Sequence, residues 1–256
     1  DGRPLLWKNR DTDFMRNHVD YVKGERYDFI AVVNSANAYL KEAWMGTNSA
    51  GFALMNTQSY NLVDVKGDEE RGAANGRVIY RALEVCATVE DFCHFLDTIS
   101  KPSDIEANFG VIDAQGGAAM FEVDYYKYVM YDANNPKDAP YGYIARTNFS
   151  FAGKVNEGAG YVRYMEADQV LMKASATGNI TPQFIFNDLS RSFRNRMLDI
   201  DLRSGGYNRP QASGWFIDQD FIPRSSTSCS VVVQGVKPGV KAGLTTLWTL
   251  LGDPPI

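Results

Sequence analysis

Lys8, Asn9, Arg10 and Asp11 follow one another near the start of the chain, after a short strand-forming run that begins at Pro4. Strand side chains alternate between two faces, so Lys8 and Asp11 can converge only if the chain bends near Arg10. A cation placed there would lower the pKa of a nearby thiol, and a carboxylate would hold a free amino group. A solvated charged turn is the other interpretation that these residues allow.

The two residues in front of this run, Asp1 and Gly2, form a dipeptide that is typical of tight hairpin turns. A hairpin turn joins two strands, and the arm before Asp1 is not in the sequence. We therefore expect a strand upstream of Asp1 to pair with the strand that follows Gly2. A chain that begins with an unpaired turn is the alternative.

Composition limits the classes of protein that fit. The chain has 256 residues, enough for one large core, and 45% of them are hydrophobic and 22% charged, as in soluble globular proteins. A net charge of −5 argues against a general nucleic-acid binder, because phosphate binding needs a basic surface. No apolar run is long enough to cross a bilayer. Three cysteines are too few for a disulfide framework.

Several common catalytic motifs are missing from the sequence. It contains no GxSxG elbow, HExxH motif, P-loop or CxxC pair. The two histidines and three cysteines lack metal-ligand spacing, so we expect neither a metal nor another cofactor. His94 neighbours Cys93 on a predicted helix, where adjacent side chains point apart, so we expect it at the surface. These absences leave a hydrolytic chemistry whose base need not be a histidine.

The order of predicted elements indicates the fold class. Strands, helices, strands, helices and strands alternate in blocks, which favours antiparallel sheets over βαβ units. We therefore predict an α+β protein, a four-layer αββα sandwich of two antiparallel sheets with helix pairs on the outer faces, in a single domain spanning 1–256. The expected strands are 4–8, 27–34, 52–57, 108–113, 118–124, 126–131, 141–149, 224–233 and 244–250, and the expected helices are 70–86, 88–99, 160–174 and 181–189.

Local signals add detail to this order. Residues 46–51 form a cluster typical of a turn, and Thr88 with Asp91 is a plausible helix-capping pair. The helix at 160–174 should turn its charged side chains outward, namely Arg163, Glu166 and Lys173. A basic stretch should form an ion-paired surface loop with the nearby aspartates, and gating of an anionic substrate is its alternative role. Its arginines are Arg191, Arg194, Arg196, Arg203 and Arg209.

The opening segment DGRPLLWKNRD resembles the segment that follows the nucleophile strand in cysteine N-terminal-nucleophile hydrolases. More narrowly it resembles the linear-amide hydrolases, which include choloylglycine (bile salt) hydrolases, penicillin V acylases and acyl-CoA:6-aminopenicillanic acid acyltransferases. The family pattern is a basic residue, Asn, any residue and Asp, which Lys8 opens and Asp11 closes. Bile salt hydrolases carry arginine in place of Lys8, and the two residues are not interchangeable at a bidentate site.

The resemblance implies roles for residues along most of the chain. Asn56, at the end of the run Ala53-Leu54-Met55-Asn56, and Asn148, in the pair Thr147-Asn148, match asparagines that bind the oxyanion in the family. Turn capping is the other common fate of a strand-end asparagine. Glu122 matches a structural strand. Bile salt hydrolases carry an active-site arginine where this chain has Cys229, and Arg224 is close enough in sequence to approach the site instead.

By this resemblance the protein is an amidase that cleaves linear, non-peptide C–N bonds. A cysteine that begins the mature chain would be the nucleophile and its own α-amino group the base, with Lys8 polarising the thiol and Asp11 holding the amino group. That cysteine would lie upstream of the given sequence, and some C-terminal residues would also be missing from it. An acyltransferase using the same site and a catalytically inactive binding protein are the alternatives.

The expected partner is a small amide, such as a bile salt, a phenoxyacyl or fatty amide, or a β-lactam amide. The sequence does not decide among these acyl and amine groups. Resemblance alone favours a periplasmic or secreted protein, and it is compatible with a homo-oligomer.

Overall fold

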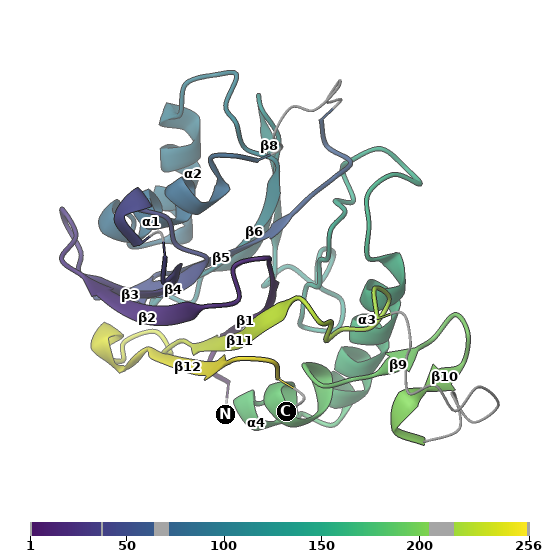
Figure 1. Cartoon of the computed structure of the whole chain (residues 1–256). Helices are drawn as coiled ribbons and strands as arrows, with labels where there is room; N and C mark the ends of the chain where they lie inside the picture. Colours follow the sequence, from purple (N-terminus) through teal and green to yellow (C-terminus); the bar gives the residue numbers. More distant parts are fainter. Residues whose placement is uncertain (1, 37, 64–71, 205–217, 255–256) are drawn as a thin grey trace.

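The computed structural model describes residues 2–36, 38–63, 72–204 and 218–254. Within these residues two antiparallel sheets face each other, and helices cover the outer face of each (Figure 1). The larger sheet has the strand order β2-β3-β4-β5-β6-β7-β8, and the smaller one has the order β1-β11-β12. The predicted α+β sandwich of four layers, αββα, is therefore confirmed.

The larger sheet consists of β2 (Asn17–Val22), β3 (Phe29–Asn34), β4 (Met45–Asn48), β5 (Ala53–Gln58), β6 (Ala107–Ile112), β7 (Ala118–Val123) and β8 (Tyr128–Asp132). The smaller sheet consists of β1 (Leu5–Asp11), β11 (Thr227–Gln234) and β12 (Thr246–Leu251). A short hairpin joins β9 (Arg194–Asn195) to β10 (Ile200–Asp201). The helices are α1 (Asn75–Val85), α2 (Val89–Thr98), α3 (Tyr161–Ala176) and α4 (Pro182–Phe184), which continues as the π-helical turn Ile185–Leu189.

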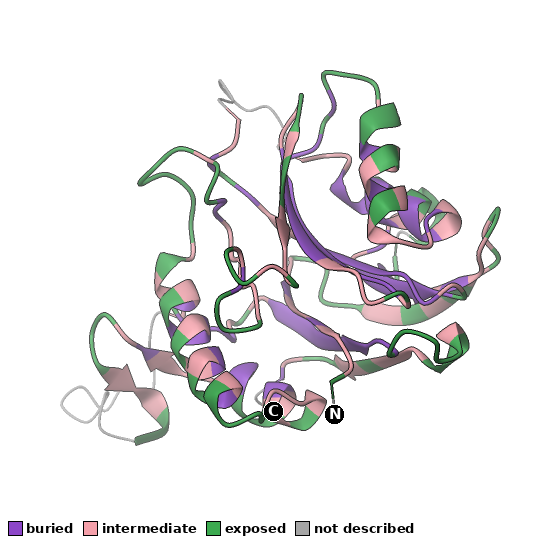
Figure 2. Cartoon of the chain, turned by 180° about the vertical axis from the view of Figure 1, so that it is seen from behind, coloured by how far each residue is buried: buried purple, intermediate pink, exposed green. Residues whose placement is uncertain are grey.

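Three apolar clusters hold the layers together. One packs α1 and α2 onto the larger sheet around Phe92, which contacts the rings of Phe109 and Phe121. A second fills the space between the two sheets, and a third joins the smaller sheet to α3 and α4. Figure 2 shows that both sheets are largely buried, while the exposed residues gather on the outer faces of the helices and in the loops.

Strand β1 takes part in two of these clusters because its side chains alternate between faces. Leu6 packs between the sheets, whereas Leu5 and Trp7 pack toward α3 and α4. The close approach of β1 to the larger sheet depends on Gly110 in β6. A Cβ atom added there would lie 2.7 Å from Cδ1 of Leu6 and 2.8 Å from Cε of Met55.

Several predicted elements are confirmed with shifted ends. The capping pair is present, since the Thr88 side chain accepts a hydrogen bond from the Asp91 backbone and the Asp91 carboxylate accepts one from the Thr88 backbone. His94 lies at the surface as predicted. The hairpin turn expected at Asp1 and the first residues of the helix expected from 70 lie outside the described residues.

Two predictions about strands were wrong. Residues 46–48 belong to strand β4, not to a turn, and the turn is confined to 49–51. Gly46 is needed for packing, because a Cβ atom there would lie 2.5 Å from the Ile30 carbonyl oxygen. The segment 141–149 is not a strand: within the described chain its one β-bridge is an isolated one between Asn148 and Ala159. Strand β2 and the β9–β10 hairpin were not predicted.

Replacing Gly110 with valine should move β1 away from the larger sheet, because the new methyl groups would occupy the place of Leu6 and Met55. We expect Gly110→Val to lower the free energy of unfolding by about 1–3 kcal/mol, the usual effect of overpacking. Urea denaturation followed by tryptophan fluorescence would measure this. Gly243→Ala is the control, because its Cβ would meet nothing closer than 3.9 Å; equal effects of both substitutions would contradict the prediction.

Candidate active site

A cavity of about 480 Å³ runs along β1. Every residue from Leu5 to Thr12 lines it, together with the segment from Tyr143 to Asn148. One part of its wall is apolar and is contributed by α3, the π-helical turn and their neighbours: Ala167, Leu171, Ile180, Ile185, Leu189 and Ile222. The polar residues of the wall include all five that the sequence singled out: Lys8, Asp11, Asn56, Asn148 and Arg224.

The bend expected near Arg10 is present. Strand β1 pairs with β11 in regular antiparallel register from Leu5 to Arg10, and the register then shifts before Asp11. Such a shift changes the local twist of a strand and redirects the side chain beyond it. Lys8 and Asp11 consequently line the same cavity, although Lys8 faces the larger sheet and Asp11 faces Arg224 on the other side of β1.

Lys8 is held by two acceptors of the larger sheet and its loops. Its Nζ donates to Oδ1 of Asn56 at 2.8 Å and to the carbonyl oxygen of Trp44 at 3.1 Å. Burial, together with the neighbouring Arg10, lowers the pKa of Lys8 to about 7, although Cys229 and Asp11 act in the opposite direction. Because Lys8 occupies the oxygen of Asn56, the NH₂ group of that amide is left as its donor toward the cavity.

Arg10 is a buried cation beside Lys8. Its guanidinium carbon lies 4.7 Å from the centre of the Trp44 ring, a cation–π distance. It donates to the side-chain oxygens of Asn17 and Asn34. Burial lowers the pKa of Arg10 to about 10. Arg10 therefore keeps its charge at neutral pH, next to a lysine that is close to losing its own.

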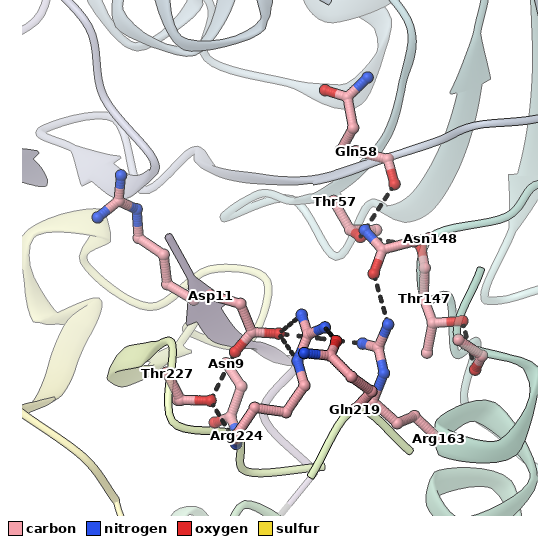
Figure 3. Close-up of polar contacts among 12 residues, drawn as sticks. Asn9, Asp11, Thr57, Gln58, Thr147, Asn148, Arg163, Gln219, Arg224 and Thr227 are labelled. Atoms are coloured by element: carbon pink, nitrogen blue, oxygen red, sulfur yellow. Dashed lines mark hydrogen bonds and ion pairs between the residues drawn. The ribbon is translucent and has the colours of Figure 1, made fainter. Parts of the chain in front are cut away.

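Asp11 is fixed by three side chains. Arg224 donates to its Oδ2 through Nε at 3.0 Å and through Nη2, and Thr227 donates to its Oδ1 at 2.6 Å (Figure 3). Nη1 of Arg163 lies 4.0 Å from the same Oδ2. Arg224, whose approach to the site the sequence left open, thus makes two hydrogen bonds to one carboxylate oxygen of Asp11.

Asn148 is held by hydrogen bonds at both ends of its side-chain amide (Figure 3). Its Nδ2 donates to the carbonyl oxygen of Gln58 at 2.9 Å and to Oγ1 of Thr57 at 3.4 Å. Its Oδ1 accepts from Nη2 of Arg163 at 2.7 Å, and its carbonyl oxygen accepts from the backbone of Ala159. Thr57 and Gln58 directly follow Asn56, so the two predicted asparagines meet at the end of β5.

The prediction that Arg163 and Glu166 point outward was wrong. Both are buried, whereas Lys173 is exposed as expected. Glu166 accepts hydrogen bonds from Arg196 and Ser192, so burial of its charge is compensated. The helical period could have predicted the burial of Arg163, because residue 163 lies four positions before the buried Ala167 and eight before the buried Leu171.

Only some arginines of the basic stretch form the predicted surface ion pairs with nearby aspartates. Arg194 pairs with Asp199 at the surface, as expected of an ion-paired loop. Arg196, however, pairs with Glu166 of α3, and Arg191 donates to the carbonyl oxygen of Pro254. The last predicted member, Arg209, lies outside the described residues.

Glu122 and Arg146 form a buried ion pair that anchors the segment carrying Asn148. Nε of Arg146 lies 2.6 Å from Oε1 of Glu122, and the two side chains are 4% and 0% exposed. The carboxylate also accepts from the backbone N–H groups of Phe151 and Ala152. In the described part of the chain, the segment that carries Asn148 is therefore anchored by the buried Glu122 carboxylate of β7 and not by backbone hydrogen bonds to a neighbouring strand.

Cys229 lies in the apolar cluster between the two sheets and is completely buried, and burial raises its pKa. The other cysteines, Cys86 and Cys93, belong to the region of α1 and α2. All three are described, and none of them lines the cavity. At the position that matches the bile salt hydrolase arginine, this chain therefore has a thiol that is buried in the core.

No cluster of three or more histidine, cysteine, aspartate or glutamate side chains in 2–36, 38–63, 72–204 and 218–254 is arranged to hold a metal ion. In the same ranges no helix has both the length and the apolar character that crossing a membrane requires.

Comparison with solved structures finds proteins of similar fold. The chain is similar to the Caenorhabditis elegans N-acylethanolamine-hydrolyzing acid amidase ortholog, with 13% identity, a TM-score of 0.53, and coverage of 97% of this chain and 95% of that one. It also matches penicillin V acylase from Agrobacterium tumefaciens, with 16% identity, a TM-score of 0.41, and coverage of 91% and 76%. A mutant conjugated bile acid hydrolase from Clostridium perfringens matches with 11% identity, a TM-score of 0.41, and coverage of 99% and 86%.

The family itself is shown by the sequence. The model of the acyl-coenzyme A:6-aminopenicillanic acid acyl-transferase family matches residues 1–188, which is most of the chain. The chain therefore belongs to this family. A comparison with curated proteins finds no match. Family and fold together make the protein an amidase-like or acyltransferase-like enzyme of the N-terminal-nucleophile group, as the resemblance implied.

Replacing Glu122 with glutamine should release the segment that carries Asn148, because it leaves the buried Arg146 without its counter-charge. Removing one partner of a buried ion pair costs about 3–5 kcal/mol, so we expect Glu122→Gln to lower the free energy of unfolding by that amount in urea denaturation. Glu25→Gln is the control, since Glu25 pairs with Arg81 at the exposed surface and should leave the denaturation midpoint unchanged. An unaltered midpoint in Glu122→Gln would show that the pair does not anchor the segment.

Proposed function

We propose that the protein cleaves linear, non-peptide C–N amide bonds through an N-terminal cysteine, in the manner of a choloylglycine hydrolase. The observation that carries the proposal is the cavity along β1, whose wall places Lys8, Asp11, Asn56 and Asn148 around one space. The family match and the fold support the same class of reaction.

The proposed place of the nucleophile is a strand that pairs with the open edge of β1. On its other edge β1 pairs with β11, and within the described chain no strand occupies the edge toward the cavity. The segment 143–147, which is extended but belongs to no sheet in the same part of the chain, also lines the cavity. A strand inserted there would satisfy the backbone groups of β1 and would complete a single domain.

The proposed reaction proceeds through an acyl-enzyme. The cysteine thiolate attacks the amide carbon, so that a C–S bond forms and the carbonyl π electrons move to oxygen. Collapse of this oxyanion breaks the C–N bond, and the leaving nitrogen takes a proton from the α-ammonium group of the cysteine. Water then attacks the thioester carbon and gives a proton to the α-amino group, and breakage of the C–S bond releases the acid and restores the thiolate beside the α-ammonium group.

The side chains of the cavity suit these steps. Lys8, when charged, would favour the thiolate, and Asp11 would hold the α-amino group, with Arg224 and Thr227 fixing the carboxylate. Asn56 and Asn148 would donate to the oxyanion. For Asn148 the available hydrogen is the one directed at Thr57, because that bond is long at 3.4 Å.

Acyl transfer is the second candidate, because the matching family is described as an acyl-transferase. The same acyl-enzyme would then be attacked by an amine in place of water. The two are separated by adding an amine acceptor to a reaction and analysing whether acid or a new amide accumulates.

A substrate panel tests the proposal directly. Conjugated bile salts, phenoxyacyl amides, fatty acyl amides and β-lactam amides would be supplied to the native protein, and amine release would be scored. Intact mass and N-terminal sequencing would establish whether the native chain begins with a cysteine, and replacement of that cysteine is the control. A native chain that starts at Asp1 and releases no amine would indicate a binding protein with this fold.

Removal of the Asn148 amide should slow turnover. We expect Asn148→Ala to reduce kcat by about a hundredfold or more, the usual effect of losing one oxyanion donor, while circular dichroism stays that of the native fold. Asn134→Ala is the control, because Asn134 is exposed in a turn and donates to the carbonyl oxygen of Gly116. Unchanged kcat in Asn148→Ala would remove this residue from the site.

The lowered pKa of Lys8 gives turnover a pH dependence. With a pKa of about 7, Lys8 carries its charge below that pH and loses it above, so kcat should fall as pH rises through about 7. Lys8→Arg should keep kcat high at higher pH, because an arginine stays protonated, and Lys8→Met should be slow at every pH. A pH profile of kcat for the three proteins checks this, and a profile unchanged by Lys8→Arg would contradict it.

A further inference from the structure

We propose that Arg163 is a positioning residue that fixes the orientation of the Asn148 amide relative to the Asp11 carboxylate. The inference rests on the proposed amidase function and adds to it a residue that the motif match does not include. The side chains of Arg163, Asn148 and Asp11 all line the same cavity.

One planar group connects two separate elements of the site. Nη2 of Arg163 donates to Oδ1 of Asn148 at 2.7 Å, and its Nη1 lies 4.0 Å from Oδ2 of Asp11 (Figure 3). Asn148 belongs to an irregular segment and Asp11 ends β1, so neither position determines the other through a shared ladder. The Arg163 side chain is only 11% exposed.

Arg163 is in an unfavourable place for a purely structural residue. It lies in the first turn of α3, where the helix dipole disfavours a cation. Burial, together with the nearby Arg224, lowers the pKa of Arg163 to about 10. Its buried Nε has no hydrogen-bond partner in the described structure. A neutral side chain would avoid all three costs, which indicates that the charge and the fork of the guanidinium are used.

The backbone beside Arg163 leaves room for this arrangement. Gly160 has a φ of +83°, and a Cβ atom there would lie 2.6 Å from Nη2 of Arg163 and 2.9 Å from Oγ1 of Thr147. Thr147 in turn donates to the carbonyl oxygen of Gly160 at 3.0 Å. The start of α3 is therefore fitted around the guanidinium and the segment that carries Asn148.

The effect on Asn148 follows from the shape of an amide. A rotation by 180° would exchange its NH₂ group and its oxygen, and the site would then present an acceptor where the reaction needs a donor. The guanidinium of Arg163 can only donate hydrogen bonds, so it is compatible only with the orientation that turns the Asn148 oxygen toward it. Together with the carbonyl oxygen of Gln58 it keeps the NH₂ group on the side of Thr57.

The first test separates positioning from folding. Arg163→Met should lower kcat about 10- to 100-fold with KM changed less than about threefold, the usual scale of misplacing a reacting group. Arg163→Lys should recover only part of kcat, since an ammonium lacks the fork. Guanidinium ion at a non-denaturing concentration should raise the kcat of Arg163→Ala. Arg196→Met is the matched control, because it breaks the buried pair with Glu166 on the same helix and should lower stability without lowering kcat.

The second test does not require turnover. The side-chain NH₂ resonances of Asn148, assigned by their loss in Asn148→Asp, should be sharp and slow to exchange in the native protein and should broaden or exchange faster in Arg163→Met. Unchanged NH₂ signals, or an equal loss of kcat in Arg196→Met, would overturn the inference. If the native protein releases no amine from any amide of the panel, the proposed function fails, and the resonances still decide whether Arg163 orients Asn148.

Discussion

The charge balance of the cavity is the constraint on which the site depends. Five cations line it, Lys8, Arg10, Arg146, Arg163 and Arg224, whereas Asp11 is the one carboxylate among its described lining residues. Arg146 is neutralised by Glu122 and Arg224 is paired with Asp11, so the remaining positive charge is concentrated on Lys8, Arg10 and Arg163. Burial lowers the pKa of each of these three, and a neighbouring cation contributes for Lys8 and Arg163. The arrangement is suited to a site in which negative charge develops, as on a thiolate and an oxyanion.

The fold holds these charges in place with contacts that are far apart in the sequence. The register shift after Arg10 directs Asp11 toward β11 and Arg224, while Lys8 stays against the larger sheet. The larger sheet supplies Asn56 at the end of β5 and, through Glu122 on β7, fixes the segment that carries Asn148. The first turn of α3 closes the ring with Arg163. Each layer except α1 and α2 thus contributes to one cavity wall, and those two helices act by burying the outer face of the larger sheet.

Local sequence signals predicted the elements whose stability is local. The Thr88–Asp91 capping box and the apolar period of α2 needed no tertiary information, and the helix was found with its N-cap. The segment 141–149 was misjudged because its residues favour a strand, while ladder pairing depends on a neighbour that the described chain does not provide. Arg163 was missed for a different reason. Its burial is stabilised by Asn148 and Asp11, which are distant in sequence, so a charged residue on an apolar stripe was assigned to solvent although its helical position was right.

The open edge of β1 relates the fold to the chemistry. An unpaired strand edge beside a cavity leaves backbone N–H and C=O groups without the partners they normally find in a folded protein. The same cavity is lined by more cations than its described carboxylates neutralise. A strand that pairs with β1 and begins with a cysteine would satisfy both deficits, because its backbone would complete the ladder and its thiolate would meet Lys8. A buried side chain from elsewhere would correct the charge alone, and a water-filled cavity would hydrate the edge without supplying a nucleophile. The strand of the proposed reaction is therefore the one occupant among these that would meet both deficits.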